Sequence, residues 1–211
     1  MIYNVIIIFL EINVKLFLLD DHALFGQGLK SMLEKHKEVE ICDYEGNVCN
    51  FFDRLDTNDY DILIIDINLS NNFTGFDVIK KVLSNNCKQK VVILTTYDLY
   101  MYKIKALKLG VNDYLTKSIE INELIEKLNT VMKGQKFWCK KSKLEPLTPK
   151  EIEILNELTK GHTRKVIAKK FYISEKTLYN HIAHIYRKLN VTNLIAAYNK
   201  AIKFGYINPV I

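Results

Sequence analysis

The stretch that most constrains the fold is the apolar run Ile62–Ile65, which lies between two acids, Asp61 and Asp66. Three of its four residues are β-branched, and a short continuous run of this kind is typical of a strand buried on both faces of a parallel sheet. Open α/β sheets carry their functional groups at the carboxyl ends of the strands. Asp66 therefore stands where such a fold places its chemistry, although a lone aspartate there would more often be a solvated loop residue.

Asp66 is not alone, because three other apolar runs also end in polar side chains. Val14–Leu19 is followed by Asp20 and Asp21, Val91–Leu94 by Thr95, and the run at 112–116 by Lys117. If the strands are parallel, these ends lie at one edge of the sheet. We therefore expect three acids, a hydroxyl and a lysine to converge on one pocket.

Helical spacing of apolar residues fills the intervals between the predicted strands. Helices are expected at residues 22–35, 48–55, from Gly75, 99–109 and 120–132, with a further strand at Val39–Cys42. Five strands alternating with five helices predict an α/β domain with a doubly wound five-stranded parallel sheet over residues 14–132. Residues 1–13 are an apolar N-terminal extension, interrupted by polar residues, and no membrane anchor or signal peptide is expected from them.

The chain changes character after this domain. Residues 133–146 are rich in lysine and are interpreted as a linker, and residues 147–211 show helical patterns only. Thr148 and Glu151 form a capping box, while Thr163 and Ser174 are expected to cap a second and a third helix. A fourth helix is expected near 194–204. The second and third helices, joined by a tight turn, predict a second, all-α domain with a helix-turn-helix.

The net charge of the chain also changes sign at this boundary. Residues 1–132 carry 14 Lys and Arg against 19 Asp and Glu, a net charge of −5, whereas residues 133–211 carry 16 against 5, a net charge of +11. A strongly basic back half indicates a polyanionic partner. The four cysteines show no metal-ligand spacing, so we expect reduced thiols in a cytoplasmic protein.

Clustered carboxylates repel one another, and a divalent cation relieves that repulsion. Oxygen ligands suit Mg²⁺. Such a site could accept a phosphoryl group on one carboxylate. In this interpretation Asp66 is the nucleophile, Asp20 and Asp21 hold the metal, Thr95 senses the product and Lys117 neutralises its charge. Taken singly, Thr95 would pass as a strand-end cap and Lys117 as a solvated lysine.

With these residues the sequence resembles the receiver domain of two-component response regulators, a flavodoxin-like fold. The resemblance rests on four stretches, Leu19–His22, Ile64–Asp66, Val92–Thr95 and Tyr114–Lys117. It implies that Asp66 is the phosphoacceptor, that Tyr114 is a switch aromatic beside the switch hydroxyl Thr95, and that the backbone carbonyl of Asn68 is a further metal ligand. Residues 147–189 resemble a LuxR-type helix-turn-helix, and the combination is that of the NarL/FixJ family.

Two departures from the family pattern affect the pocket loops. Residues 69–72 replace a usual proline after the phosphoacceptor, and Gly75 comes one residue late. Ser118 stands where many receivers have a cis proline after the lysine. These changes bear on loop geometry and on the rate of phosphoryl turnover, whereas the fold and the capacity for phosphorylation are still expected.

In the resembling family the third helix of the basic half is the recognition helix, whose first turns enter the major groove. Lys176, Asn180, Ala183 and Arg187 share one outward face at i, i+4, i+7 and i+11. Tyr179, Asn180 and Ala183 are expected to face bases, since Asn can bond adenine and Ala can touch a thymine methyl. The expected phosphate contacts, which set affinity rather than sequence choice, are Lys176, Thr177, Arg164 and Lys165.

The resemblance implies a transcription regulator and not an enzyme. Its expected partners are a sensor histidine kinase, double-stranded promoter DNA, a second copy of the chain on activation and, as a further candidate, RNA polymerase. Three alternatives compete. The first is an atypical regulator that binds DNA without phosphorylation, which the altered loop after Asp66 favours. The second is a metal-dependent phosphatase, which is disfavoured because Asn68 stands where that class needs a second Asp, and the third is a small-molecule-sensing LuxR-type regulator, which leaves the acids and Lys117 unexplained.

Overall fold

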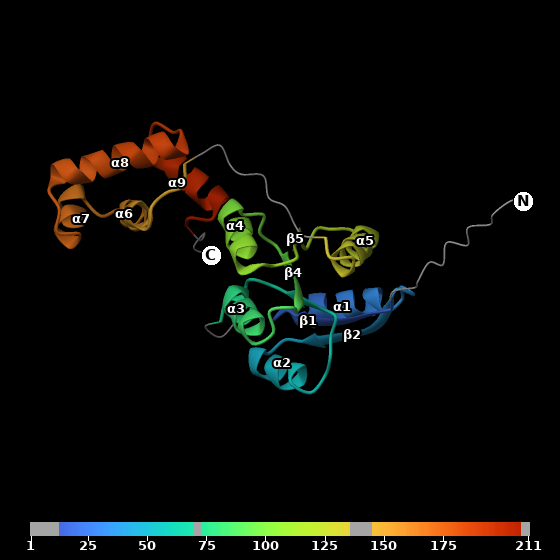
Figure 1. Ribbon diagram of the computed structural model, residues 1–211. Coiled ribbons are helices and arrows are strands. Elements are labelled where there is room, and N and C mark those ends of the chain that lie inside the picture. Colours follow the sequence, from blue (N-terminus) through green and yellow to red (C-terminus); the bar gives the residue numbers. More distant parts are fainter. Residues whose placement is uncertain (1–12, 70–72, 136–144, 208–211) are drawn as a thin grey trace, which may run out of the picture. The chain divides into compact units, whose positions relative to one another are not determined.

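The computed structural model describes residues 13–69, 73–135 and 145–207 of a chain that divides into two compact units (Figure 1). Most of the N-terminal extension and of the expected linker lies outside the described residues. Among the described residues, no helix is long and apolar enough to cross a membrane.

The first unit contains a five-stranded parallel sheet in the order β2-β1-β3-β4-β5. This is the expected doubly wound arrangement. The strands are β1 (Val14–Leu19), β2 (Val39–Glu45), β3 (Ile62–Ile65), β4 (Lys90–Thr95) and β5 (Asp113–Thr116). The helices between and after them are α1 (Ala23–Leu33), α2 (Val48–Leu55), α3 (Gly75–Asn85), α4 (Tyr100–Leu109) and α5 (Ile121–Met132).

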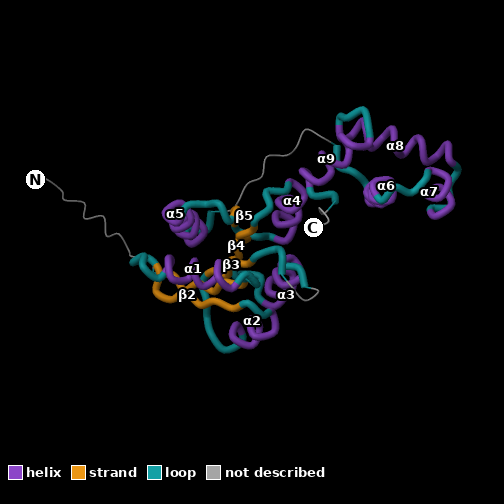
Figure 2. The backbone as a smooth tube through the Cα atoms, turned by 180° about the vertical axis from the view of Figure 1, so that it is seen from behind, coloured by secondary structure: helices purple, strands orange, loops and turns teal. Residues whose placement is uncertain are grey.

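Helices cover both faces of the sheet, with α1 and α5 on one side and α2 and α3 on the other (Figures 1 and 2). The alternation of side chains along β1 shows the two layers. Leu16 and Leu18 belong to the core under α1 and α5, while Phe17 stacks on Phe51 of α2 at a centroid distance of 4.5 Å. All four residues of β3 are completely buried, as the apolar run predicts for a central strand.

The edge strand β2 is longer than the sequence suggested. It was expected to end at Cys42, yet it continues through Asp43, Tyr44 and Glu45 because β1 pairs with it as far as Leu19 opposite Glu45. An edge strand has one open side, so polar residues can remain in it. The last three residues of β2 lie beside the acidic pair that follows β1.

The second unit contains α6 (Pro149–Thr159), α7 (Arg164–Lys170), α8 (Glu175–Leu189) and α9 (Leu194–Phe204). The capping box of Thr148 and Glu151 is present, and Thr163 and Ser174 cap α7 and α8 as expected. The core is built from one face of each helix. On α6, Ile154 is completely buried and Ile152 is only partly buried.

Candidate functional site

The carboxyl edge of the sheet gathers the polar strand ends. Asp20 follows β1, Asp66 follows β3, Thr95 ends β4 and Lys117 follows β5, and Asp20, Asp66 and Thr95 are almost completely buried. The topology makes these positions neighbours because β1, β3, β4 and β5 are adjacent and parallel. The structure therefore brings together the pocket residues that the strand ends predicted.

Lys117 joins the two buried acids. Its ammonium nitrogen lies 2.6 Å from Asp20 Oδ2 and 2.6 Å from Asp66 Oδ2. Burial lowers the pKa of Lys117, but the hydrogen bonds and charges of the two carboxylates outweigh it and raise that pKa. Charge-assisted bonds of this length are strong, so the lysine is a fixed counter-ion of the pocket.

The Asp66 carboxyl has a raised pKa. Burial is the main cause, and the negative charge of Asp20 adds to it, while Lys117 and the hydroxyl of Thr95 act in the opposite direction. The ionised form of a carboxylate that is buried in this way is stabilised when positive charge enters the pocket. The environment of Asp66 is therefore arranged for a partner that supplies such charge.

The acidic pair is ordered by the residue that follows it. The backbone N–H of His22 donates to Asp20 Oδ1 at 3.0 Å, and His22 Nδ1 lies 3.2 Å from Asp20 Oδ1 and 3.0 Å from Asp21 Oδ1. Ligand atoms of Asp20, Asp21, His22 and Asp66 all lie within 4.8 Å of one another. This oxygen-rich set could hold a divalent cation.

His22 is the member of this cluster that sequence reasoning did not assign to the site. The sequence predicts a helix start at this residue, and it is the N-cap residue of α1. The signal that could have found it is the run of two aspartates and a histidine at a strand end. The imidazole side chain is 63% exposed, so it stands at the mouth of the pocket.

The loop after Asp66 is closed by backbone contacts. The N–H of Asn68 lies 3.4 Å from Asp66 Oδ1, and Gly75 N–H donates to Ile67 O at 2.8 Å. A Cβ atom at Gly75 would lie 2.0 Å from the backbone oxygen of Asp66, so only glycine allows this approach. Residues 70–72 of the altered loop lie outside the described residues.

Thr95 and Tyr114 lie on the neighbouring strands β4 and β5. The Thr95 hydroxyl is buried. It is near enough to Asp66 to influence the pKa of that carboxyl, but it makes no close hydrogen bond within the described ranges. The Tyr114 side chain is 5% exposed, and its hydroxyl donates to Tyr97 O at 2.5 Å. The expected switch aromatic thus points inward and bonds the loop that follows β4.

The expected nucleic-acid contacts are exposed on α7 and α8. All eight are on the surface: Arg164, Lys165, Lys176, Thr177, Tyr179, Asn180, Ala183 and Arg187. Arg164 joins the two helices, since its NH1 donates to the Tyr179 hydroxyl at 2.8 Å and its guanidinium carbon lies 4.7 Å from the ring centroid. Arg187 lies 3.5 Å from Glu145, which draws it toward the start of the unit.

Helix α8 presents this face because its opposite face is anchored. Leu178, Ile182 and Ile185 are buried in the core. Near its end, Lys188 Nζ lies 2.9 Å from Glu151 Oε2, and both side chains are less than 10% exposed. The polar face of α8 is therefore held on a rigid support.

Family models match both parts of the chain. The response regulator receiver domain matches residues 16–129, and the luxR family of bacterial regulatory proteins matches residues 145–201. Transcriptional regulatory protein DegU of Brevibacillus brevis is 26% identical, covering 93% of this chain and 96% of that protein. Nitrate/nitrite response regulator protein NarP of Escherichia coli is 27% identical, covering 87% and 92%.

Solved structures are also similar over most of the chain. A structure of two RcsB dimers bound to two parallel DNAs is similar with a TM-score of 0.69, 25% identity, and coverage of 90% of this chain and 98% of that one. The response regulator ChrA of a heme-sensing two-component system gives a TM-score of 0.51 and 27% identity, covering 93% and 100%.

Proposed function

Because the chain belongs to the NarL/FixJ-type two-component response regulators, with a receiver domain and a LuxR-type helix-turn-helix domain, we propose that phosphorylation of Asp66 controls its binding to promoter DNA. The donor is a sensor histidine kinase. The functional parts are the receiver at residues 14–132, the linker at 133–146 and the DNA-binding domain at 147–211. The location that fits these partners is the cytoplasm.

The pocket suits acceptance of a phosphoryl group. An oxygen of Asp66 attacks phosphorus as the P–N bond to the donor imidazole breaks, and the new P–O bond gives an acyl phosphate. The Lys117 ammonium, which bonds the two carboxylates beforehand, then also interacts with the phosphoryl oxygens and offsets part of their negative charge. The Thr95 hydroxyl, which makes no close hydrogen bond among the described residues, donates to one of those oxygens.

A divalent cation fits the acids of this pocket. Asp20, Asp21 and Asp66, with the backbone carbonyl of Asn68, would hold Mg²⁺, which when bound supplies positive charge to the transferring group. Two observations support the fit. The candidate ligand atoms of the acids lie within 4.8 Å of one another, and two buried carboxylates share one lysine.

The signal passes through Thr95 and Tyr114. When Thr95 bonds the phosphoryl group, the space beside it changes and Tyr114 gives up its bond to Tyr97 O. The surface around α4 and β5 is altered, and recognition helix α8 becomes available to DNA. Dimers form, partly through α9, and bind a repeated half-site, as symmetric helix-turn-helix dimers do.

On the DNA, Tyr179, Asn180 and Ala183 face bases, while Lys176, Thr177, Arg164 and Lys165 contact phosphates. Arg187 lies on the same face one turn beyond Ala183. The exposure of all eight side chains supports this assignment, as does the DNA complex of the similar protein RcsB. A bound regulator of this kind could also contact RNA polymerase.

The observation that carries the proposal is the placement of Lys117 2.6 Å from both Asp66 and Asp20 in a buried pocket. The test is treatment with acetyl phosphate and Mg²⁺, followed by intact mass, with Asp66→Asn as the control. We expect a phosphoryl-sized gain in wild type that the variant lacks. A folded wild-type protein that gains nothing would favour the alternative of phosphorylation-independent DNA binding.

A further inference from the structure

The hydroxyl of Tyr44, at the end of β2, donates to the backbone carbonyl of Asp20 at 3.0 Å. We infer that Tyr44 is a positioning residue of the pocket, which fixes the backbone from which the Asp20 and Asp21 carboxylates project toward a metal. This inference rests on the proposed metal-assisted phosphorylation. It adds a residue from the edge strand to a site otherwise built from the ends of β1, β3, β4 and β5.

Asp20 is held at both of its backbone polar groups by consecutive residues of β2. Its carbonyl accepts from Tyr44, and its N–H donates to the backbone oxygen of Glu45 at 3.2 Å. The Glu45 carboxylate in turn accepts from the N–H groups of Gly46 and Asn47 at 2.9 and 3.0 Å. A segment tied in this way has few alternative conformations, so the carboxylates after β1 are preorganised.

The ring of Tyr44 occupies space that a glycine on α1 leaves open. A Cβ atom at Gly26 would lie 2.1 Å from Cε2 and 2.5 Å from Cδ2 of Tyr44. Any other residue at position 26 would displace the ring. Gly26 and Tyr44 therefore form a matched pair that lets an aromatic side chain reach past α1 to the acidic pair.

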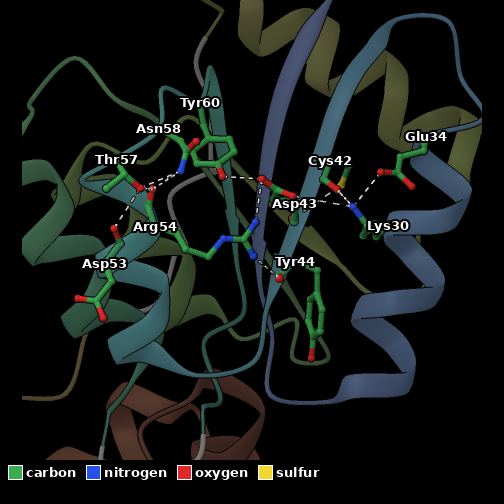
Figure 3. Close-up of polar contacts among 10 residues, drawn as sticks. All are labelled: Lys30, Glu34, Cys42, Asp43, Tyr44, Asp53, Arg54, Thr57, Asn58 and Tyr60. Carbon is green, nitrogen blue, oxygen red and sulfur yellow. Dashed lines mark hydrogen bonds and ion pairs between the residues drawn. The ribbon is translucent and has the colours of Figure 1, made fainter.

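The other end of Tyr44 is anchored by Arg54 (Figure 3). Its NH1 donates to the Tyr44 backbone oxygen at 3.1 Å, and its NH2 lies 2.9 Å from Asp43 Oδ2. Tyr60 donates to the same Asp43 oxygen at 2.6 Å. Figure 3 shows the Tyr44 ring pointing away from this network. The hydroxyl of Tyr44 therefore extends from a backbone that Arg54 holds in place.

The phenol hydroxyl suits this role, because it supplies a neutral hydrogen bond to the Asp20 carbonyl without adding a charge to an already acidic site.

The test removes single hydroxyl groups. Tyr44→Phe deletes the bond to Asp20 and keeps the ring against Gly26. Tyr60→Phe is the matched control, because it deletes a tyrosine hydrogen bond to Asp43 of β2 that does not reach the pocket. The apparent affinity for Mg²⁺ is obtained from the rise in the thermal unfolding midpoint as Mg²⁺ is added to the full chain.

We expect Tyr44→Phe to weaken the apparent Mg²⁺ affinity by about three- to tenfold, the range that one lost hydrogen bond can produce, while Tyr60→Phe leaves it within about twofold of wild type. Without Mg²⁺, amide exchange at residues 19–22 should be faster in Tyr44→Phe alone. Both readouts are independent of phosphorylation.

Three results would overturn the inference. If wild type responds to Mg²⁺ and Tyr44→Phe responds equally, Tyr44 has no positioning role and the proposed function stands. If both variants weaken Mg²⁺ binding to the same extent, the effect is a general loss of β2 rigidity. If wild type itself shows neither a Mg²⁺ shift nor a phosphoryl-sized mass gain, the proposed function fails and the inference falls with it.

Discussion

The ammonium nitrogen of Lys117 lies 2.6 Å from Asp66 Oδ2, and the lysine side chain is only 11% exposed. The same nitrogen is equally close to Asp20 Oδ2, so one cation serves two buried carboxylates. The Lys117 ammonium therefore offsets the mutual repulsion of these two carboxylates. The pocket thus depends on Lys117 before any phosphoryl group arrives.

Replacing Lys117 with Gln should lower the free energy of unfolding by about 3 kcal/mol in metal-free buffer, because it leaves buried carboxylates without their counter-ion. Added Mg²⁺ should restore part of the loss. Lys15→Gln is the control, since Lys15 forms an exposed ion pair with Glu40 at 3.5 Å, which is worth at most about 1 kcal/mol. Urea unfolding measures both; equal losses in the two variants would contradict this account of the pocket.

Gly75→Ala should destabilise the receiver by more than about 2 kcal/mol, because the new Cβ would lie 2.0 Å from the Asp66 backbone oxygen and the backbone must move. It should also slow acceptance of the phosphoryl group, since the same movement displaces Asp66. Urea unfolding and the rate of mass gain with acetyl phosphate measure the two effects.

Gly28→Ala is the control for Gly75→Ala. Gly28 lies inside α1, and nothing lies within 4 Å of its added Cβ. Alanine there should stabilise the protein by about 0.5–1 kcal/mol through helix propensity. A stable, fully active Gly75→Ala variant would show that the loop after Asp66 has more freedom than this structure gives it.

The carboxyl of Glu157 has its pKa lowered to about 2, chiefly by hydrogen bonds to Lys170 and Lys160, with His162 contributing. The ordinary value is 4.5, so the ionised carboxylate stabilises the folded domain above pH 4.5. This contribution should be lost as the pH falls toward 2.

The Glu157→Gln variant should therefore unfold at lower urea than wild type at pH 6, and the two should approach one another as the pH falls. Residue-resolved NMR of α6 and α7 during urea titration follows this unit specifically. Glu153→Gln is the control on the same helix, since Glu153 is exposed and 4.0 Å from its partner Lys150. A difference that stayed constant with pH would exclude this linkage.

The sequence predicted the sheet and the convergence of Asp20, Asp66, Thr95 and Lys117, because apolar runs identify strands and parallel strands bring their ends together. It could not predict that Lys117 lies equally close to both acids. That geometry depends on the χ angles of a long side chain, which strand register does not specify.

Two other features were hidden from sequence for related reasons. Asp43, Tyr44 and Glu45 look like a polar loop, and only pairing with β1 makes them part of a strand. The contact of the Tyr44 ring with Gly26 joins β2 to α1. The sequence around a glycine in a helix does not show which side chain fills the space beside it. Leu24 of α1 is apolar and yet 90% exposed, since helical spacing alone does not say where a core ends.

Lys176→Gln should weaken DNA binding for all sequences and reduce the slope of log affinity against log salt by about 0.9, the value of one phosphate contact. Lys88→Gln, in the loop before β4, is the control, because it removes the same charge from an exposed site outside the DNA-binding domain. Binding is measured over a salt series with DNA that wild type selects from a random pool. An unchanged slope for Lys176→Gln would remove this residue from the phosphate contacts.

Asn180→Ala should act differently, because a base contact carries sequence information and a phosphate contact does not. Asn180 is exposed on the face of α8 that also holds Lys176 and Ala183, and its amide can bond adenine at two atoms. The variant should lose about 1–3 kcal/mol on the wild-type site and almost nothing on unrelated DNA, with the salt slope intact. Competition between the selected site and single-base variants measures the change, which should be confined to one position in each half-site. If Asn180→Ala instead weakened selected and unrelated DNA alike, the residue would lie against the phosphate backbone and sequence choice would depend on other residues of α8.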